Sequence, residues 1–432
     1  MREKELMVYR DFGQDGKLLS EMAWISRHFQ EKSRKARTKL YACMGGLLEL
    51  GGSHGFYGNL WHCYLSNLLV NHENSYSRAC EIRGAVEGTV NAAVLHDIAI
   101  FRELFTFDFA AVSRALQVPE FDQVLSYEGN EQESRVYNTR IRDRICTLAV
   151  RLAAASSAEE MKERLTEFYR EYGVGKFGLH KAFRIGHRRT EDGAEAVVIE
   201  PILNIAHVKL SDLVGYETAK KKLVENTEAF VSGRKANNCL LYGDAGTGKS
   251  SSIKAIANEY YDRGLRIIEV YRHQFRDLND VIAQIKNRNY KFIIYMDDLS
   301  FEDFETEYKY LKAVIEGGLE KKPDNVLIYA TSNRRHLIRE KFSDKRERDE
   351  DLHTNDTVQE KLSLVYRFGV TIYFGAPDKA QFQQIVKALA QRANISLPEE
   401  ELLAEANKWE LFHGGLSGRT AQQFIDYLSG TL

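Results

Sequence analysis

Residues 240–251 have the sequence LLYGDAGTGKSS, and this stretch decides the fold of the chain. Between Gly243 and Ser250 it matches the pattern G-x-x-x-x-G-K-[ST] in full. A short apolar segment precedes the match and a helical pattern follows it, which is the context that such a loop requires. The glycines allow backbone N–H groups to converge on phosphate oxygens, and the N-terminus of the helix adds a favourable dipole. The stretch therefore predicts a phosphate-binding loop between a strand and a helix.

Two side chains of this loop have the chemistry that nucleotide binding needs. Lys249 supplies a positive charge to the β- and γ-phosphates, and the Ser250 hydroxyl can bind Mg²⁺. We therefore expect ATP and Mg²⁺ as ligands, with Ser250 as one contact of the metal ion. The residues expected to surround the phosphates are Gly243, Asp244, Ala245, Gly246, Thr247, Gly248, Lys249, Ser250 and Ser251.

A second motif lies in KFIIYMDDLSF, which begins at Lys291 and contains two adjacent aspartates. Asp297 ends an apolar strand, where a carboxylate is costly to bury unless it is paired or orders a cation. In a phosphate-loop fold that cation is Mg²⁺, which Asp297 contacts largely through metal-bound water. Asp298 is then placed to polarise the attacking water as a general base.

Many ATP-splitting machines have a glutamate where this chain has Asp298, and the aspartate is one methylene shorter. Aspartate and glutamate have similar intrinsic basicity, so the difference is one of reach. A misplacement near 1 Å can lower a rate on the order of a hundredfold, but the backbone can compensate if the strand ends closer to the phosphates. The substitution alone neither proves nor excludes hydrolysis, and a role for Asp298 in capping the next turn stays open.

The composition is that of an ordinary soluble globular protein. The chain has 432 residues, a formal net charge of -2, 44% hydrophobic and 28% charged residues, which suggests two or three domains. The charge excludes a global positive field that would indicate nucleic acid binding. No apolar run reaches the roughly 18 residues of a membrane span, and the start, MREKELMVYRDFG, lacks the apolar core of a signal peptide. Five scattered cysteines without a CxxC pair indicate free thiols, so we expect a cytoplasmic protein.

The pattern along the chain predicts four parts. Residues 1–172 are mostly helical and are expected to recognise a partner or client, and the glycine-rich residues 173–207 form a linker or a small hairpin. Residues 208–376 alternate strands and helices, and residues 377–432 contain only helical patterns. Near-continuous apolar strands predict a five-stranded parallel sheet covered on both faces. The expected strands are 239–242, 265–270, 291–296, 325–331 and 370–374.

From about Val208 to Leu432 the sequence resembles the AAA+ ATPase superfamily. LSDLVGYETAKKKLVENTEAF is similar to the segment before the phosphate loop there, and it places Val214, Gly215 and Tyr216 against the adenine. In IYATSNRRHL, Asn333 matches sensor 1, which contacts the γ-phosphate or the attacking water. GGLSGRTAQQFIDYL resembles the sensor 2 helix, where Arg419 reaches the phosphates unless it is a surface arginine. The resemblance implies a phosphate-loop AAA+ core, a C-terminal helical lid and a mostly helical N-terminal domain.

One more arginine bears on assembly. KLSLVYRFGVTIYF places Arg367 just before the fifth strand, at a position that looks like the arginine finger. Such a finger stabilises charge on the phosphoryl group in the ATP site of a neighbouring subunit. The resemblance therefore implies a homo-oligomer with head-to-tail contacts and ATP sites at the subunit interfaces. Rivals for this role are Arg334, Arg335, Arg346 and Arg348.

A narrower resemblance is to the bacterial AAA+ family known as domain of unknown function 815. It rests on ANNCLLYGDAGTGKSS, DDLSFE, PDNVLIYATSNRRHL, EKLSLVYRFG and GRTAQQFIDYL, and it extends more weakly into the N-terminal half. Paired aspartates belong to that family's pattern, so the resemblance implies that Asp298 is a family trait. The family implies a fold and a nucleotide site but not a biological role.

These observations predict an AAA+ ATPase that hydrolyses Mg-ATP in an oligomer to remodel a macromolecular client. The alternative is a nucleotide-gated loader or switch with slow or partner-triggered hydrolysis and an association with DNA. A third reading is a nucleotide-stabilised scaffold, which has no need of sensor residues. The client stays open between protein and nucleic acid. VYRHQFRDLND lacks the glycine of a threading loop, and the basic run RHFQEKSRKARTKLY from Arg27 suits either a phosphate backbone or a solvated face.

Overall fold

The computed structural model describes residues 2–129, 134–190, 192–301, 307–316, 322–333, 337 and 364–431. They form two compact units, Met1–His180 and Lys181–Leu432. In these described ranges no helix is both long and apolar enough to cross a membrane. All five cysteines are buried and none forms a disulfide, which confirms the expected free thiols.

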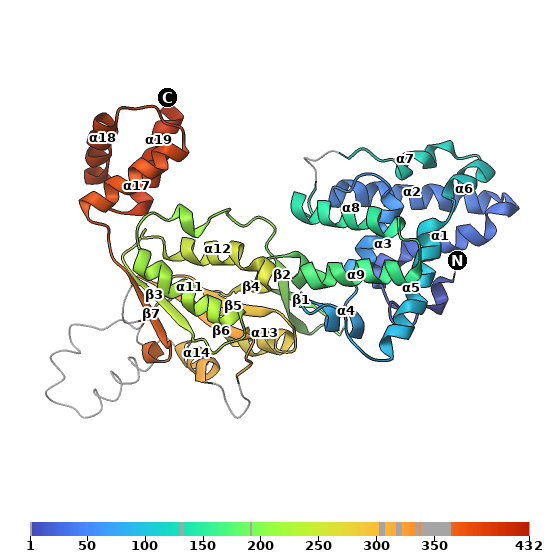
Figure 1. The fold of residues 1–432 in the computed structure, drawn as a ribbon, viewed down its shortest axis with the longest axis horizontal. Coiled ribbons are helices and arrows are strands. Elements are labelled where there is room, and N and C mark those ends of the chain that lie inside the picture. The colour runs from blue at the N-terminus through green and yellow to red at the C-terminus, as the bar shows by residue number, and fades with distance from the viewer. Residues whose placement is uncertain are drawn as a thin grey trace. The chain divides into compact units, whose positions relative to one another are not determined.

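The first unit is a helical domain, drawn from blue to green in Figure 1. Helix α3 is its centre, because ten of its twelve residues are buried and a helix that is apolar all round belongs in a core. The α9 helix is capped by Ser157, whose hydroxyl accepts a hydrogen bond from Glu160 N at 3.2 Å. The described helices are α1 (Lys17–His28), α2 (Arg34–His54), α3 (Leu60–Asn71), α4 (Ser75–Cys80), α5 (Val90–Thr106), α6 (Phe109–Leu116), α7 (Asp122–Leu125), α8 (Thr139–Ala153), α9 (Ala158–Tyr172) and α10 (Gly175–Leu179).

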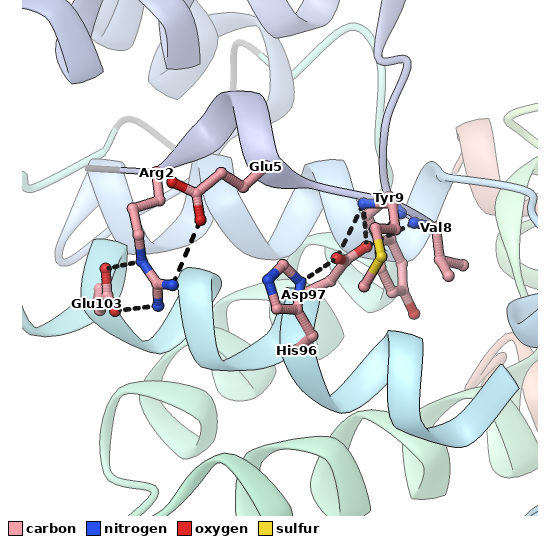
Figure 2. A network of polar contacts seen from close by, with 8 residues as sticks. Arg2, Glu5, Val8, Tyr9, His96, Asp97 and Glu103 are labelled. Atoms are coloured by element: carbon pink, nitrogen blue, oxygen red, sulfur yellow. Dashed lines mark hydrogen bonds and ion pairs between the residues drawn. The ribbon is translucent and has the colours of Figure 1, made fainter. Parts of the chain in front are cut away.

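A buried carboxylate ties the N-terminal segment to α5, as Figure 2 shows. Asp97 has no exposed surface, and its Oδ2 accepts hydrogen bonds from Val8 N at 2.7 Å and Tyr9 N at 2.9 Å. Its Oδ1 accepts a further bond from Met7 N at 2.9 Å. A buried charge is tolerated when several donors surround it, and here three consecutive backbone N–H groups do so.

We expect Asp97→Ala to lower the free energy of unfolding of this unit by about 3 kcal/mol, because three N–H donors lose their acceptor together. Asp108→Ala is the matched control, since Asp108 caps α6 through one bond to Ala111 N and such a cap contributes about 1 kcal/mol. Urea unfolding and hydrogen exchange of the N-terminal segment would measure both. Equal losses in the two variants would contradict the role assigned to Asp97.

The second unit is built on one sheet with the strand order β2-β1-β4-β5-β6-β3-β7. All five predicted strands are present and pair in parallel. The predicted count of five is nevertheless wrong, because the sheet has seven strands among the described residues. The strands are β1 (Ala182–Arg189), β2 (Glu195–Pro201), β3 (Cys239–Gly243), β4 (Leu265–Glu269), β5 (Lys291–Met296), β6 (Val326–Ser332) and β7 (Val370–Phe374).

The two additional strands come from the glycine-rich segment before the alternating pattern. β1 and β2 form an antiparallel hairpin, and β1 also pairs in parallel with β4 through Ala182 to Arg184. The hairpin turn closes with Thr190 N donating to Ala194 O at 2.8 Å. Without this addition, the apolar strand β4 would be an exposed sheet edge, which is a site for unwanted strand pairing.

Helices cover both faces of this sheet. On one face Leu223 and Phe230 of α11 and Ile253 and Ile256 of α12 form a single core with alternate strand residues. Helices α17, α18 and α19 pack instead around their own core, centred on Phe382 and Phe424. The described helices are α11 (Glu217–Val231), α12 (Lys249–Glu259), α13 (Leu278–Ile285), α14 (Glu307–Glu316), α17 (Lys379–Arg392), α18 (Glu399–Phe412) and α19 (Gly418–Thr431).

Candidate nucleotide and metal site

The phosphate loop lies between β3 and α12, where the sequence predicts it. Gly243 ends β3 with φ of +137°, and a Cβ atom there would lie 2.1 Å from the carbonyl oxygen of Phe374 on β7. No other residue fits this position without moving the neighbouring strand. Gly246 and Gly248 also have positive φ, which lets the loop curl back over the start of α12.

Lys249 is the first residue of α12 and is only 6% exposed. Its Nζ donates to the carbonyl oxygens of Gly243 at 3.0 Å and Asp244 at 2.5 Å. Burial lowers the pKa of the ammonium group, although the nearby carboxylates of Asp244, Asp298 and Asp297 oppose this shift. An ammonium group has three donors, so one remains for an anion in the loop.

Asp297 follows β5 directly and lies within hydrogen-bond distance of the phosphate loop. Its Oδ1 accepts a hydrogen bond from the Ser250 hydroxyl at 2.8 Å, so the two predicted metal contacts are adjacent. Desolvation raises the pKa of Asp297, but donors led by the hydroxyls of Thr331, Tyr295 and Ser250 outweigh it, and the net pKa lies below the usual value. The site therefore presents an ionised carboxylate beside a hydroxyl, which are hard oxygen donors that fit Mg²⁺.

Asp298 has an unusual backbone conformation for a residue with a side chain. Its φ is +49°, in the left-handed region that aspartate and asparagine tolerate best. Its Oδ1 accepts a hydrogen bond from Asn333 Nδ2 at 2.8 Å, and its backbone N donates to Thr331 Oγ1 at 3.0 Å. The sharp turn after β5 thus brings the short carboxylate to the end of β6, where the predicted sensor residue holds it.

A cavity of about 740 Å³ joins these groups. Its walls come from the phosphate loop, the ends of β5 and β6, the segment before α11, and the C-terminal helices. Arg419 enters from α19, whose start contacts the loop, because Arg419 N donates to Gly246 O at 3.2 Å. The predicted site residues that line the cavity are Val214, Tyr216, Ala245, Gly246, Thr247, Gly248, Lys249, Ser250, Ser251, Asp297, Asp298, Asn333 and Arg419.

The wall expected to face an adenine contains Val214 and Tyr216, together with Phe374. The rings of Tyr216 and Phe374 are 5.4 Å apart, and the Tyr216 hydroxyl donates to Gly375 O at 3.1 Å. Burial, with a contribution from the Asp244 charge, raises the pKa of Tyr216 to about 12. The wall is therefore mostly apolar, with one neutral phenol.

Four predicted residues do not form the wall of the cavity. Gly215 has φ of +81° between Val214 and Tyr216. Gly243 is the last residue of β3, at the start of the loop. Asp244 contacts the start of the C-terminal part, since its Oδ2 accepts a bond from Ala376 N at 2.7 Å. Arg367 follows a short helical turn before β7 and is not among the residues around this cavity. Its rivals Arg334, Arg335, Arg346 and Arg348 are outside the described residues.

Several residues of the site were not predicted, and three of them make polar contacts there. Tyr295 of β5 and Thr331 of β6 contact Asp297. Both lie among apolar strand residues, so the sequence pattern around them indicates burial rather than a site. Arg392, at the end of α17, lines the cavity and donates to Ser211 O at 2.9 Å and Asp212 O at 2.7 Å. The position of Tyr295 could have indicated its contact with Asp297, because it lies two residues earlier and therefore on the same face of the strand.

The fold and this site define a protein of the AAA+ ATPase superfamily: a phosphate loop follows one parallel strand and a carboxylate pair follows another. Residues 181–432, more than half of the chain, match the model of the family described as "Protein of unknown function (DUF815)". The chain belongs to this family. The matched residues are those of the second unit.

Curated relatives match short stretches only. The replication factor C large subunit of Staphylothermus marinus is 39% identical over 74 residues, which are 17% of this chain and 17% of that subunit. The corresponding subunit of Methanococcus maripaludis is 40% identical over 77 residues, 18% of this chain and 15% of the relative. This chain thus spans less than a fifth of the length of these relatives.

Solved structures with a related fold include a RuvB mutant from Thermotoga maritima, with a TM-score of 0.38 and 16% identity over 52% of this chain and 66% of that one. The FIGL-1 AAA domain in complex with ADP has a TM-score of 0.36 and 16% identity, over 53% of this chain and 75% of that one.

Proposed function

We propose that this chain binds Mg-ATP and hydrolyses it within an oligomer to remodel a macromolecular client. The observation that carries the proposal is the convergence of the phosphate loop, Asp297, Asp298, Asn333 and Arg419 on one cavity. A site that only held a nucleotide would need the loop and Lys249. It would not need a second carboxylate held by an amide at the end of the next strand.

Each group then has one part in the reaction. The loop N–H groups and Lys249 hold the phosphates, while Ser250 and Asp297 hold the metal ion. When bound there, Mg²⁺ would supply positive charge to offset the negative charge on the transferring phosphoryl group. Asp298 accepts a proton from the attacking water, and Asn333 keeps its carboxylate in place. Arg419 approaches the phosphates from α19.

In this proposal, a neighbouring subunit supplies one more positive charge to the transferring phosphoryl group. Arg367 is absent from the cavity wall of its own chain, which suits a finger that acts on the next subunit. Residues 377–432 are assigned as the lid, since α17 and α19 both contribute to the cavity. Client recognition is assigned to the helical residues 1–172.

We expect ATP turnover to rise more than linearly with protein concentration, because a site lacks its finger until subunits associate. Arg367→Ala should lower turnover on the order of 10³-fold. Mixing it with Lys249→Ala should restore part of the activity, because the latter has no working site but supplies the finger. Arg234→Ala, which removes an exposed arginine after α11, is the matched control. Turnover proportional to concentration, without recovery on mixing, would contradict the oligomeric site.

A nucleotide-gated loader or switch is the second candidate. It is supported by the short stretches shared with proteins named as replication factor C large subunits, and it implies an association with DNA. In that case ATP binding alone would set the conformation, and turnover would stay slow until a partner is added. Sustained turnover by the purified chain would contradict this candidate.

A further inference from the structure

Three hydroxyl groups from three different elements converge on one oxygen atom of Asp297. The Ser250 hydroxyl of α12 lies 2.8 Å from Oδ1, the Tyr295 hydroxyl of β5 lies 2.7 Å from it, and Thr331 Oγ1 of β6 lies 2.5 Å from it. Tyr295 is 4% exposed and Thr331 is 1% exposed. Two of the three donors are therefore buried beneath the carboxylate, while Ser250 belongs to the phosphate loop.

The direction of these hydrogen bonds follows from the chemistry of the groups. An ionised carboxylate only accepts, so each hydroxyl must donate its proton to Oδ1. Three donors use the full accepting capacity of that oxygen. None of the hydroxyl groups among the described residues donates to Oδ2, which leaves Oδ2 as the oxygen that can accept from another ligand.

Thr331 has a second contact that links the two carboxylates of the site. Since its proton goes to Asp297, its oxygen accepts from the backbone N of Asp298 at 3.0 Å. One buried hydroxyl thus fixes the side chain of Asp297 and the backbone of Asp298, where φ is +49°. The position of the base therefore depends on the same residue as the position of the metal-binding carboxylate.

We propose that Tyr295 and Thr331 are positioning residues for the metal ion: they occupy Oδ1 of Asp297 and thereby reserve Oδ2 for metal-bound water. This inference rests on the proposed function. Ser250 is the donor that a bound ion would recruit as a ligand, and the two buried hydroxyls would then hold the carboxylate alone. Partners that orient a metal-binding carboxylate typically contribute 10–100-fold to metal affinity or activity.

The test is the dependence of nucleotide binding on Mg²⁺, which needs no turnover. The probe is ribose-labelled adenylyl imidodiphosphate, and its Kd is measured by fluorescence titration of the full chain with Mg²⁺ and with a chelator. The ratio of the two Kd values is the Mg²⁺ coupling. We expect Tyr295→Phe to reduce this coupling about tenfold and to leave the Kd in chelator unchanged.

A buried tyrosine on the neighbouring strand provides the matched control. Tyr329 of β6 is fully buried, and its hydroxyl bonds to Asn226 Nδ2 at 2.9 Å and Thr227 Oγ1 at 3.1 Å, away from the carboxylates. Tyr329→Phe removes the same atom at similar burial, so it should leave the Mg²⁺ coupling at the wild-type value. A general loosening of the core would instead lower the Mg²⁺ coupling of Tyr295→Phe and Tyr329→Phe by similar factors.

Thr331 allows the inference to be tested even if Tyr295→Phe does not fold. Thr331→Val removes both hydrogen bonds of this side chain and should reduce the Mg²⁺ coupling about tenfold. Thr331→Ser keeps the hydroxyl and should keep the coupling at the wild-type value. Wild-type coupling in Tyr295→Phe, or equal losses in Thr331→Val and Thr331→Ser, would overturn the inference alone. A wild-type chain that binds no nucleotide under either condition would overturn the proposed function, and this inference with it.

Discussion

Lys249→Ala should abolish measurable ATP turnover and weaken ATP binding by about ten- to a hundredfold, because a hydrogen bond to a charged group contributes about 1.5–3 kcal/mol. The side chain donates to the carbonyl oxygens of Gly243 and Asp244 and keeps one donor for a phosphate. Folding has already removed most of the water from Lys249, since the residue is 6% exposed. Pairing it with a phosphate therefore adds little desolvation cost.

The control for this variant removes the same charge from the same helix. Lys254 is exposed on α12, and Lys254→Ala should leave binding and turnover unchanged. Isothermal titration calorimetry with ATP and a steady-state phosphate assay would measure both variants, and thermal melting would show that each is folded. Binding retained by a folded Lys249→Ala chain would contradict the phosphate loop as the nucleotide site.

Asp298→Asn should lower ATP turnover by about 10²–10⁴-fold, the usual contribution of a general base, while ATP binding is retained. Asparagine tolerates the left-handed backbone that Asp298 adopts, where φ is +49°. Its side-chain oxygen can still accept the bond from Asn333 Nδ2. The variant therefore removes the charge and the basicity with little change in structure.

Asp298→Glu tests whether the short side chain is suited to this backbone. The aspartate carboxylate already reaches Asn333 at 2.8 Å, so an added methylene should displace it and lower the rate. Single-turnover hydrolysis and ATP titration would be measured for the three chains side by side. Unchanged turnover in Asp298→Asn would contradict its role as the base, and faster turnover in Asp298→Glu would contradict the fit of the aspartate.

The phosphate loop and the five predicted strands were evident in the sequence because they are local features. Gly243 to Ser250 carries its loop geometry in residue types, and runs such as 291–296 are apolar on both faces because a parallel sheet is covered twice. The hairpin of β1 and β2 was harder to place. Its turn at Thr190 to Gly193 is a local signal, but its pairing with β4 is a contact between residues distant in the chain.

The contacts around Asp297 likewise combine local features, which the sequence shows, with contacts between distant residues, which it does not. Its position after an apolar strand identified it as a metal-binding candidate, and Ser250 was identified by the loop motif. Thr331 looked like an ordinary strand residue, because nothing in ATSN indicates that its hydroxyl lies 2.5 Å from a carboxylate on the neighbouring strand. Arg392 likewise has no motif, and its place in the cavity wall depends on how α17 packs.

The sequence by itself determined which residues have the chemistry for a nucleotide and a metal ion, because glycine, lysine and aspartate at set spacings leave few alternatives. The tertiary structure alone decided how those residues are held. The parallel strands β5 and β6 place Tyr295, Asp297 and Thr331 within hydrogen-bond distance, and the positive φ of Asp298 turns its carboxylate toward Asn333. Strand register and backbone strain arise from pairing across the sheet, so they are set by contacts that no local stretch of sequence records.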